Sequence, residues 1–315
     1  MAGVLHGLEG VFEIIFMIGL AFVLAKRHWF SADASMLLTR LVMNISLPLY
    51  MIYSLQKSFT HNSLCSMITD LRLPVISILL CYGIARVAVK LLHIRQGRQG
   101  VFITTTFAAS TIFVGLPVNL ALFGENSVPS VMLYYMANTS LYWTIGQYHI
   151  MHDCCNDEQR VSFISMQTLK KVFSAPLMGF LLGVLLLVAD IKLPEFVLTS
   201  FRYVGNLTTP LSLFVIGIEM SAIPLASLHW DKDIFWACIG RFIVSPFCVI
   251  MLLPVISVSD MSMKVFAMQA SMPAMATMTL VTKVAGGDIK YCTTICFVTV
   301  VLGILFIPIY MALME

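Results

Sequence analysis

Hydrophobic residues run in long blocks along this chain, with short polar stretches between them. A helix of roughly 20 apolar residues is long enough to cross the hydrocarbon core of a bilayer. Ten blocks come close to that length. They predict ten membrane-spanning helices, which we number as spans 1–10, over residues 5–25, 36–56, 72–92, 101–123, 128–149, 168–189, 196–220, 233–256, 262–284 and 289–312.

The one distinctly polar and fairly long connection lies in the middle of the chain, at residues 150–167. It divides the sequence into a first half of five spans (1–149), a linker that we expect to be cytoplasmic, and a second half of five spans (168–315). A unit with an odd number of spans begins and ends on opposite sides of the membrane. A second copy of it therefore has to enter the membrane upside down.

Several short motifs recur in the same order in the two halves. RLVMNISLP (residues 40–48, span 2) and RYVGNLTTP (202–210, span 7) share Arg, Asn and Pro at steps of four. Span 4 contains FAASTIFVGLP and ends in FGEN, and span 9 contains MQASMPAMATM and ends in AGGD. The shared order predicts two inverted five-helix repeats, an arrangement that is typical of secondary transporters.

Spans 4 and 9 each combine proline with small and hydroxyl residues, around 109–117 and 271–277. A lone proline is most simply a kink. Two such interruptions at corresponding positions favour true breaks, which survive in a membrane only where protein or water lines them. A broken helix presents a positive N-terminal end at mid-depth. Two crossed broken helices would therefore form an anion site without a lysine or an arginine.

The candidate substrate-binding residues are polar or small and lie in these interrupted spans or in their neighbours. Hydroxyl groups add hydrogen-bond donors, amides can satisfy freed backbone groups, and glycine lets the backbone approach a ligand closely. Pro117 and Pro273 are expected to secure the crossover. The full set of candidate substrate-binding residues is Asn44, Ser110, Thr111, Gly115, Asn138, Asn206, Gln269, Pro273 and Thr277.

Charged residues are rare within the spans. Glu13 in span 1 is a candidate for coupling to an ion, with an ion pair or a position near the helix end as the alternative. Arg40 and Arg202 are candidates for gating or for attracting anions at the two membrane surfaces, and snorkelling is the alternative for both. Arg86 and Arg241, in spans 3 and 8, form another pair by order in the sequence and could snorkel too.

Composition restricts the class of protein. Apolar residues make up 59% and charged residues 11% of the chain, against roughly 25% charged residues in soluble domains. The mean hydropathy is +0.91, which predicts an all-α polytopic membrane protein with the lipid bilayer around it. The net charge of +3 and the lack of a basic run argue against nucleic acid as a partner. No HExxH, GxSxG or aspartate pair occurs in a span, so we expect no enzyme, cofactor or metal site.

The distribution of lysine and arginine predicts the orientation. With the N-terminus outside, eleven of the nineteen Lys and Arg residues fall in loops on the inner side and four in loops on the outer side. Cytoplasmic loops carry the excess of positive charge. Both termini are therefore expected on the outer side of a bacterial cytoplasmic (inner) membrane.

Five stretches resemble the auxin efflux carrier family, in particular its compact bacterial branch of malate or malonate permease-like proteins, which are distant relatives of plant PIN-FORMED carriers. They are LVMNISLPLYMI in span 2, STIFVGLPV in span 4, GNLTTPLSLFVIGIEM in span 7, SMPAMATMTLVTKVAGGD in span 9 and CTTICFVTVVLGILFIPIYMAL in span 10. One departure is that Ser110 stands where the family often has Asn, after Ala109 where relatives can have Pro. The span 4 crossover is thus not secured by a proline, whereas Pro273 keeps its place in span 9.

The resemblance implies a scaffold of spans 1, 2, 6 and 7 and a transport unit of spans 3–5 and 8–10. It further implies an elevator-type movement, a homodimer formed through the scaffold, and small organic anions as substrates. We expect a dicarboxylate such as malate or malonate. Two alternatives stay open, namely a non-transporting sensor or receptor on the same fold and a sodium-coupled carrier of the bile-acid symporter type.

Overall fold

The computed structural model describes residues 2–31, 33–58, 69–154, 173–223, 228 and 230–314. Within them, the regular structure is helical apart from one isolated bridge between Ala109 and Ala274. The predicted all-helical class is therefore confirmed. Most of the expected linker, residues 150–167, falls in the segment 155–172 and lies outside the described residues.

Helices occupy all five expected spans of the first half. Spans 2 and 5 each consist of two α-helical parts joined by a π-helical turn, and in span 4 a non-helical stretch, residues 108–110, precedes that turn. The elements are α1 (Ala2–Lys26), α2 (Ala34–Leu41), η1 (Val42–Ser46), α3 (Leu47–Ser58), α5 (Arg72–Leu91), α6 (Gln99–Phe107), η2 (Thr111–Gly115), α7 (Leu116–Phe123), η3 (Glu125–Ser127), α8 (Val128–Leu141), η4 (Tyr142–Gly146) and α9 (Gln147–Cys154).

Helices also occupy the five expected spans of the second half. Span 7 is divided between α12 and α13, and span 9 between α16 and α17. The elements are α11 (Ala175–Val188), α12 (Glu195–Gly205), α13 (Thr208–Ala222), α14 (Lys232–Ile239), η7 (Gly240–Val244), α15 (Ser245–Leu252), α16 (Asp260–Ala270), α17 (Thr277–Val284) and α18 (Ile289–Met314).

Among the described residues, four helical stretches are long and apolar enough to cross a membrane by length and composition. They are Ala34–Lys57, Arg72–Leu91, Lys232–Leu252 and Ile289–Tyr310. Two shorter apolar helices, Thr111–Phe123 and Ala175–Val188, add to them. Several of the ten predicted spans are therefore not single continuous helices, because they are interrupted.

Proline explains three of the interruptions. Pro48, Pro117 and Pro246 each lie two positions after a π-helical turn, namely η1, η2 and η7. Proline has no N–H and its ring crowds the carbonyl four residues earlier, so the preceding turn widens. In span 8 that carbonyl belongs to Phe242, and it accepts a hydrogen bond from the Tyr310 hydroxyl. A neighbouring helix thus satisfies the backbone group that the proline frees.

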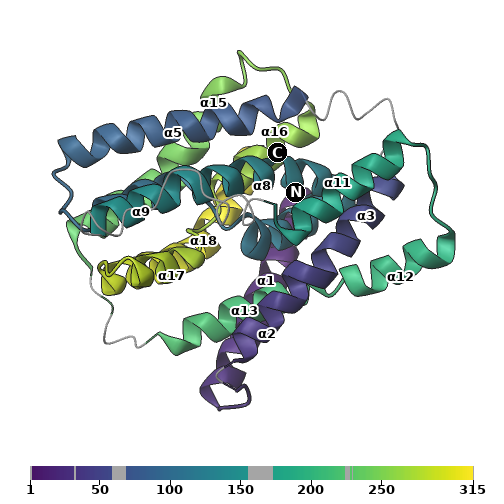
Figure 1. The fold of residues 1–315 in the computed structure, drawn as a ribbon, viewed down its shortest axis with the longest axis horizontal. Helices are drawn as coiled ribbons and strands as arrows, with labels where there is room; N and C mark the ends of the chain where they lie inside the picture. The colour runs from purple at the N-terminus through teal and green to yellow at the C-terminus, as the bar shows by residue number, and fades with distance from the viewer. Residues whose placement is uncertain are drawn as a thin grey trace.

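The helices pack in two groups, which we call set A (α1, α2, α3, α11, α12 and α13) and set B (α5–α9 and α14–α18). In set A, α1 packs mainly on α13, and α3 on α11 and α12. In set B, α6 packs on α5 and α9, while α16 packs on α8, α15 and α18. Figure 1 shows α3, α11 and α12 at the right of the molecule and α5, α9 and α17 at the left.

Glycines allow the helices of set A to approach closely. A Cβ atom on Gly217 would lie 2.4 Å from the backbone oxygen of Ile18, and one on Gly179 would lie 2.6 Å from the Cα of Pro48. Small residues at such contacts are how apolar helices pack in a membrane. Set A also has a polar centre, where the Ser46 hydroxyl donates to the Val204 carbonyl (2.6 Å) and lies 3.0 Å from the hydroxyl of Thr208.

Polar contacts hold set B together at both ends. At one end Arg98 binds Asp231 (2.5 Å) and Asp288 (2.8 Å). Burial alone would raise the pKa of Asp231, but hydrogen bonds from Arg98 and from two backbone N–H groups lower it by more, so the pKa lies below its usual value. At the other end the buried Asp70 accepts a hydrogen bond from the Ser262 hydroxyl at 2.6 Å.

The contact between the two sets is mainly apolar. A cluster separate from the main core joins α1 and α13 of set A to the interrupted helices and α18 of set B. Its buried members are Ile14, Ile18, Ala109, Val114, Val118, Leu213, Ile216, Met268, Met272 and Ile307. Among the described residues, one hydrogen bond joins the sets, between the hydroxyls of Tyr135 and Ser174 at 2.8 Å.

Candidate functional site

The two interruptions that the sequence predicts in spans 4 and 9 lie against each other. Ala109 and Ala274 form an antiparallel bridge, and the Ser110 N–H donates to the carbonyl of Pro273 at 2.8 Å. Span 4 stops being helical after Phe107 and resumes at Thr111, and span 9 stops after Ala270 and resumes at Thr277. We call this paired region, residues 108–110 and 271–276, the crossover.

Asn138 on α8 takes up the backbone groups that the span 4 break releases. Its Oδ1 accepts from the Ala109 N–H at 2.9 Å, and its Nδ2 donates to the Ala109 carbonyl at 3.0 Å. A proline at position 109 would have no N–H to satisfy. Alanine has one, and the buried Asn138 amide binds both polar groups of that residue. Asn138, predicted as a substrate contact, therefore braces the crossover.

The span 9 break has a similar brace, which the sequence did not reveal. The Ala274 N–H donates to the hydroxyl of Thr299 on α18 at 3.2 Å. Span 10 follows the second break as span 5 follows the first, so Thr299 and Asn138 have corresponding places in the two halves. A threonine in an apolar helix usually bonds its own helix, as Thr299 also does with Ile295. Nothing in the residue pattern marks its second role.

Gln269 and Gly115 form a second contact between the interrupted spans. Gln269 is fully buried on α16, and its Nε2 donates to the Thr111 carbonyl at 3.2 Å. A Cβ on Gly115 would lie 2.2 Å from the Gln269 Oε1. Gly115 is therefore needed because a buried side chain approaches the backbone closely there. The Gln269 Oε1 has no hydrogen-bond partner among the described residues.

Arg241 is fully buried beside the crossover, whereas snorkelling would have exposed it. It donates to the carbonyls of Thr105 (3.3 Å) and Ala270 and to the Ser245 hydroxyl (2.5 Å). These carbonyls belong to the last turns of α6 and α16, where the helix dipoles leave negative charge. One cation thus stabilises the ends of both half-helices, a role that the sequence did not predict.

The proposed repeat partner of Arg241 lies elsewhere. Arg86 is exposed and bonds Tyr82 and His149, both at 3.3 Å. Arg86 and Arg241, paired by their order in the sequence, thus have different surroundings, and the expected correspondence between them stays a prediction. Both residues interrupt apolar helices, but they have different partners because their helices present them to different surroundings.

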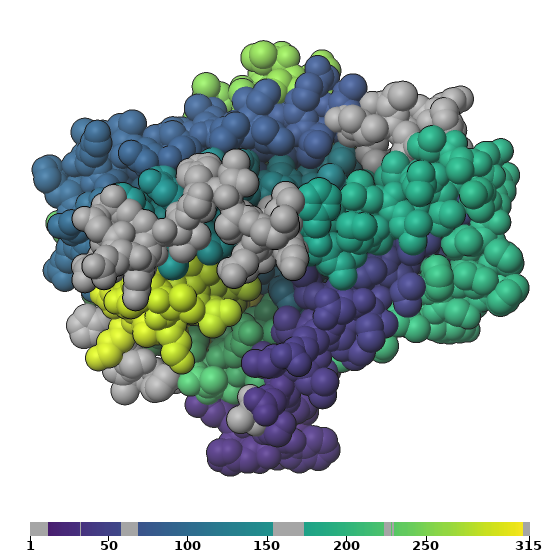
Figure 2. Space-filling model, viewed as in Figure 1, coloured from purple at the N-terminus to yellow at the C-terminus, as the bar shows by residue number. Residues whose placement is uncertain are grey.

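The two half-helices beyond the crossover differ in exposure. The η2–α7 half is largely buried and packs against α13 and α1, with Thr111, Gly115 and Pro117 all buried. The α17 half begins at the exposed Thr277 and keeps Leu280 62% exposed. Figure 2 shows this late part of the chain, in yellow, at the surface. The N-terminal turn of α17 is therefore accessible, while Ser110 is half-buried.

Several predicted site residues lie apart from the crossover. Asn44, Asn206, Arg40 and Arg202 are exposed on set A. None of the described hydrogen bonds connects them to the crossover. Between the two repeated motifs, it is the hydroxyl residues two positions after each asparagine that meet, as the Ser46–Thr208 contact shows.

The two remaining candidates also differ in position. Glu13 is exposed on α1. Pro117 lies in the first turn of α7, beyond η2, while the buried Pro273 lies within the break itself. Pro273 thus takes part in the crossover directly through its carbonyl, and Pro117 acts on the adjoining helix.

Known proteins resemble this chain over most of its length. An uncharacterized transporter of Methanocaldococcus jannaschii is 25% identical over 285 residues, covering 87% of this chain and 88% of that protein. An uncharacterized transporter of Methanothermobacter thermautotrophicus is 21% identical over 307 residues, covering 96% of each chain. A family described as "Membrane transport protein" matches residues 6–311. This chain is a multi-pass membrane transporter and belongs to that family, the auxin efflux carrier family that its motifs resemble.

Proposed function

We propose that the protein is a secondary transporter that moves a small organic anion, with malate and malonate as the first candidates, by an elevator-type mechanism. The observation that carries the proposal is the crossover, in which two broken helices meet at Ala109 and Ala274. Each break directs the positive end of a half-helix toward the middle of the membrane. An anionic substrate would lie against these ends.

The polar groups around the crossover support a site for a small anion. Ser110 and Thr277 stand at the starts of the two half-helices and can add hydroxyl donors. Arg241 is engaged with carbonyls and is buried, so it supplies positive potential without contacting solvent. Thr111, Gly115 and Gln269 shape the wall of the site, and Asn138 holds its backbone.

Two contacts support the inverted repeats of 1–149 and 168–315. Ser46 and Thr208 have the same place in the motifs at 40–48 and 202–210, and their hydroxyls meet at 3.0 Å. The breaks of spans 4 and 9, one in each half, also meet, through the bridge between Ala109 and Ala274. In a two-fold arrangement, corresponding residues meet where they lie near the axis. Both contacts join the two halves of the chain, as contacts near such an axis would.

We assign the two proposed mechanical units to the two helix sets. Set A corresponds to the scaffold of spans 1, 2, 6 and 7, and set B to the transport unit of spans 3–5 and 8–10. Set B is held by ion pairs and hydrogen bonds at both ends, whereas the contact between the sets is mainly apolar. An apolar surface lets one body slide on another without breaking many polar contacts. In this scheme Asn44 and Asn206 line the scaffold wall, and Arg40 and Arg202 attract anions at opposite surfaces.

The proposal includes a homodimer formed through the scaffold, in the cytoplasmic membrane of a bacterium with both termini on the outer side. The dimer rests on the family resemblance, and the orientation rests on the excess of Lys and Arg in the loops assigned to the inside. Glu13, exposed on α1, is the proposed coupling residue if uptake proves to depend on protons.

Uptake into proteoliposomes tests the proposal. Labelled malate, malonate and similar acids should accumulate inside vesicles that contain the purified protein and not inside empty ones. Pro273→Ala should reduce this flux, because it alters the break whose carbonyl binds Ser110. If none of these acids crosses, and Pro273→Ala changes the flux of no solute, the proposal fails.

The two alternatives give different results in the same system. A sensor or receptor on this fold, which the replacement of Asn by Ser110 favours, would bind an acid with measurable affinity and show no flux. A sodium-coupled carrier of the bile-acid symporter type would take up its substrate only with an inward sodium gradient. Uptake with the gradient present and absent separates that carrier from the proposed one.

A further inference from the structure

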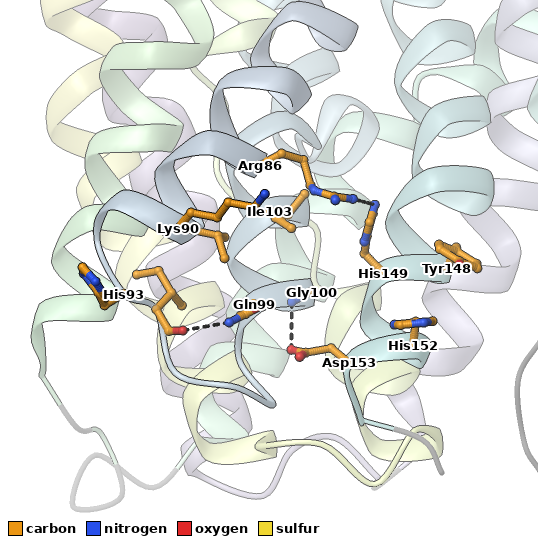
Figure 3. Close-up of a pocket in the computed structure, with 12 residues that line it drawn as sticks. Arg86, Lys90, His93, Gln99, Gly100, Ile103, Tyr148, His149, His152 and Asp153 are labelled. Carbon is orange, nitrogen blue, oxygen red and sulfur yellow. Dashed lines mark hydrogen bonds between the residues drawn. The ribbon is translucent and has the colours of Figure 1, made fainter. Parts of the chain in front are cut away.

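A cationic cavity lies at one end of set B, away from the crossover. Its volume is about 630 Å³, and α5, α6 and α9 form its walls (Figure 3). Its basic residues are Arg86, Lys90, His93, His149 and His152. One acid, Asp153, lies among them. Arg86 and Lys90 carry the positive charge, and the histidines add hydrogen-bonding groups. Such a combination at a membrane protein surface is typical of a site for an anion.

The acid of the cavity is already engaged. The Asp153 carboxylate accepts hydrogen bonds from the backbone N–H groups of Gly97 (3.1 Å) and Gly100 (2.9 Å). Asp153 therefore occupies the N-terminal end of α6 and stabilises the helix there. It pairs with none of the cavity's cations among the described residues. Among the described residues, no carboxylate forms an ion pair with Arg86 or Lys90, so their charges can bind an added anion.

Hydrogen-bond donors on two walls of the cavity are available. Arg86 donates from Nη1 to the Tyr82 hydroxyl and to His149 Nε2 (3.3 Å each), and the same hydroxyl lies 2.8 Å from that nitrogen. Because an arginine can only donate, His149 Nε2 accepts and its Nδ1 carries the proton. The side chains of Lys90 and His93 have no hydrogen bond or ion pair with the rest of the described chain.

His93 occupies a backbone position that favours glycine. It follows the last turn of α5 with φ at +53°, in the left-handed region, and the Ile94 N–H returns to the Val89 carbonyl at 3.2 Å. Glycine is the usual residue at this place in such a helix end. His93 thus places an imidazole at the cavity, although its backbone conformation favours glycine.

The surroundings of the cavity are apolar. Its floor contains Val89, Ile94 and Ile103, all buried. On the same helix, Val87 is 57% and Leu91 is 72% exposed, on the neighbouring face of α5. Exposed apolar residues of a membrane protein face lipid chains. The cationic cavity therefore adjoins a surface that acyl chains would cover.

We propose that this cavity binds the phosphate of an anionic phospholipid, with the acyl chains lying along α5. Basic pockets between membrane helices bind phospholipid headgroups in this way. Arg86 and Lys90 neutralise the phosphate, and His93, His149 and His152 donate hydrogen bonds to it and to the headgroup. This site is separate from the crossover, so the proposal does not depend on which substrate the transporter carries.

Native mass spectrometry of the purified full-length protein tests the proposal. Phosphatidylglycerol should remain bound in preference to phosphatidylcholine. Each replacement, Lys90→Gln or Arg86→Gln, should weaken phosphatidylglycerol binding about fivefold. Lys290→Gln, at an exposed lysine outside the cavity, is the matched control and should leave binding unchanged. Equal binding of both lipids, or equal binding by Lys90→Gln and the control, overturns the proposal.

His93→Gly separates binding from folding. It removes the imidazole and places the favoured residue at a left-handed position, so thermal stability in pure phosphatidylcholine nanodiscs should stay the same or rise. Phosphatidylglycerol binding should still fall. A further arm adds inorganic phosphate to the phosphatidylcholine nanodiscs. If phosphate alone stabilises the protein as much as phosphatidylglycerol does, and Lys90→Gln removes that effect, the site takes a free anion and the lipid assignment is wrong.

Discussion

At the scale of single residues, the crossover depends on contacts that leave little room for change. Gly115 and Gln269 illustrate this, because the Cβ of any other residue at position 115 would lie 2.2 Å from the Gln269 Oε1. The atom it meets is the end of a flexible side chain, so Gln269 would have to turn away and would lose its hydrogen bond to Thr111. The two residues should therefore act as a pair.

Gly115→Ala should destabilise the protein by about 1–3 kcal/mol, the usual effect of overpacking a buried site, and should reduce transport. Shortening the partner should restore part of the loss, so Gly115→Ala with Gln269→Ala should be less harmful than the two single effects added together. Thermal unfolding in detergent measures the stability of each variant, and anion uptake measures its transport. Gly83→Ala is the control, because a Cβ there has no neighbour within 4 Å. If the losses of the two single variants simply add in the double variant, Gly115 and Gln269 do not act as a pair.

Asn138→Ala should leave the N–H of Ala109 without a partner, at about 1–3 kcal/mol for a buried group left unsatisfied. The Ala109 carbonyl would keep its hydrogen bond from the Thr111 N–H at 2.9 Å. Asn138→Asp keeps an acceptor for the Ala109 N–H, so its stability should lie between that of the wild type and that of Asn138→Ala. Ser54→Ala, which removes a buried hydroxyl without a partner among the described residues, should have little effect. The midpoint of thermal unfolding compares the three variants. An Asn138→Ala protein as stable as wild type would rule out the bracing role.

At the scale of elements, the main result is that interrupted helices are stabilised by their neighbours. Arg241 on η7 binds the last turns of α6 and α16 together, Asn138 on α8 braces the first break, and Thr299 on α18 braces the second. Lipid offers no hydrogen bonds, so each exposed backbone group at a break needs such a partner.

Arg241→Gln should therefore be strongly destabilising. The carbonyls of Thr105 and Ala270 would lose their donor in a buried site, at about 1–3 kcal/mol each. Arg241→Lys should recover only part of the stability, because a single ammonium group lacks the forked geometry that reaches several acceptors. Arg72→Gln, at an exposed position, should stay within about 0.5 kcal/mol. Similar unfolding midpoints for Arg241→Gln and Arg72→Gln would exclude the role given to Arg241.

The repeated motifs of set A allow a test that distinguishes function from folding. Asn44→Leu and Asn206→Leu change exposed residues and should impair uptake more than expression, if these residues line the scaffold wall. Ser46→Ala removes the hydroxyl contacts with Val204 and Thr208 and should lower stability and uptake together. Expression and uptake are measured for all three. Parallel losses of both in the asparagine variants would assign the motif a structural role only.

These elements also show how far sequence reasoning reaches. The breaks in spans 4 and 9 could be predicted because proline and glycine act on the backbone locally. The role of Asn138 could be anticipated in part, since a buried amide in a span needs partners. Arg241 and Thr299 could not be assigned, because their partners lie 136 and 25 residues away along the chain. The different surroundings of Arg86 and Arg241 could not be predicted either, since order in the sequence does not fix which face of a helix meets which neighbour.

At the scale of the whole molecule, the two helix sets differ in how they are held. Each has internal polar contacts, such as Lys57 with Glu195 in set A (3.0 Å) and Arg98 with its aspartates in set B. The described contact between them is mainly apolar, with one hydrogen bond, between Tyr135 and Ser174, joining the described residues of the two sets. Two firm bodies with a mainly apolar contact are what an elevator-type movement requires. In the proposed mechanism, the unequal exposure of the two half-helices would correspond to access from one side at a time.

A structure determined with the anion that the uptake assay selects tests the central claim most directly. The account predicts ligand density at the crossover, against the start of α17 near Thr277 and within reach of Ser110, with the Ala109–Ala274 pairing intact. Density for the transported anion at a different place, with the crossover empty or its two breaks unpaired, would contradict it.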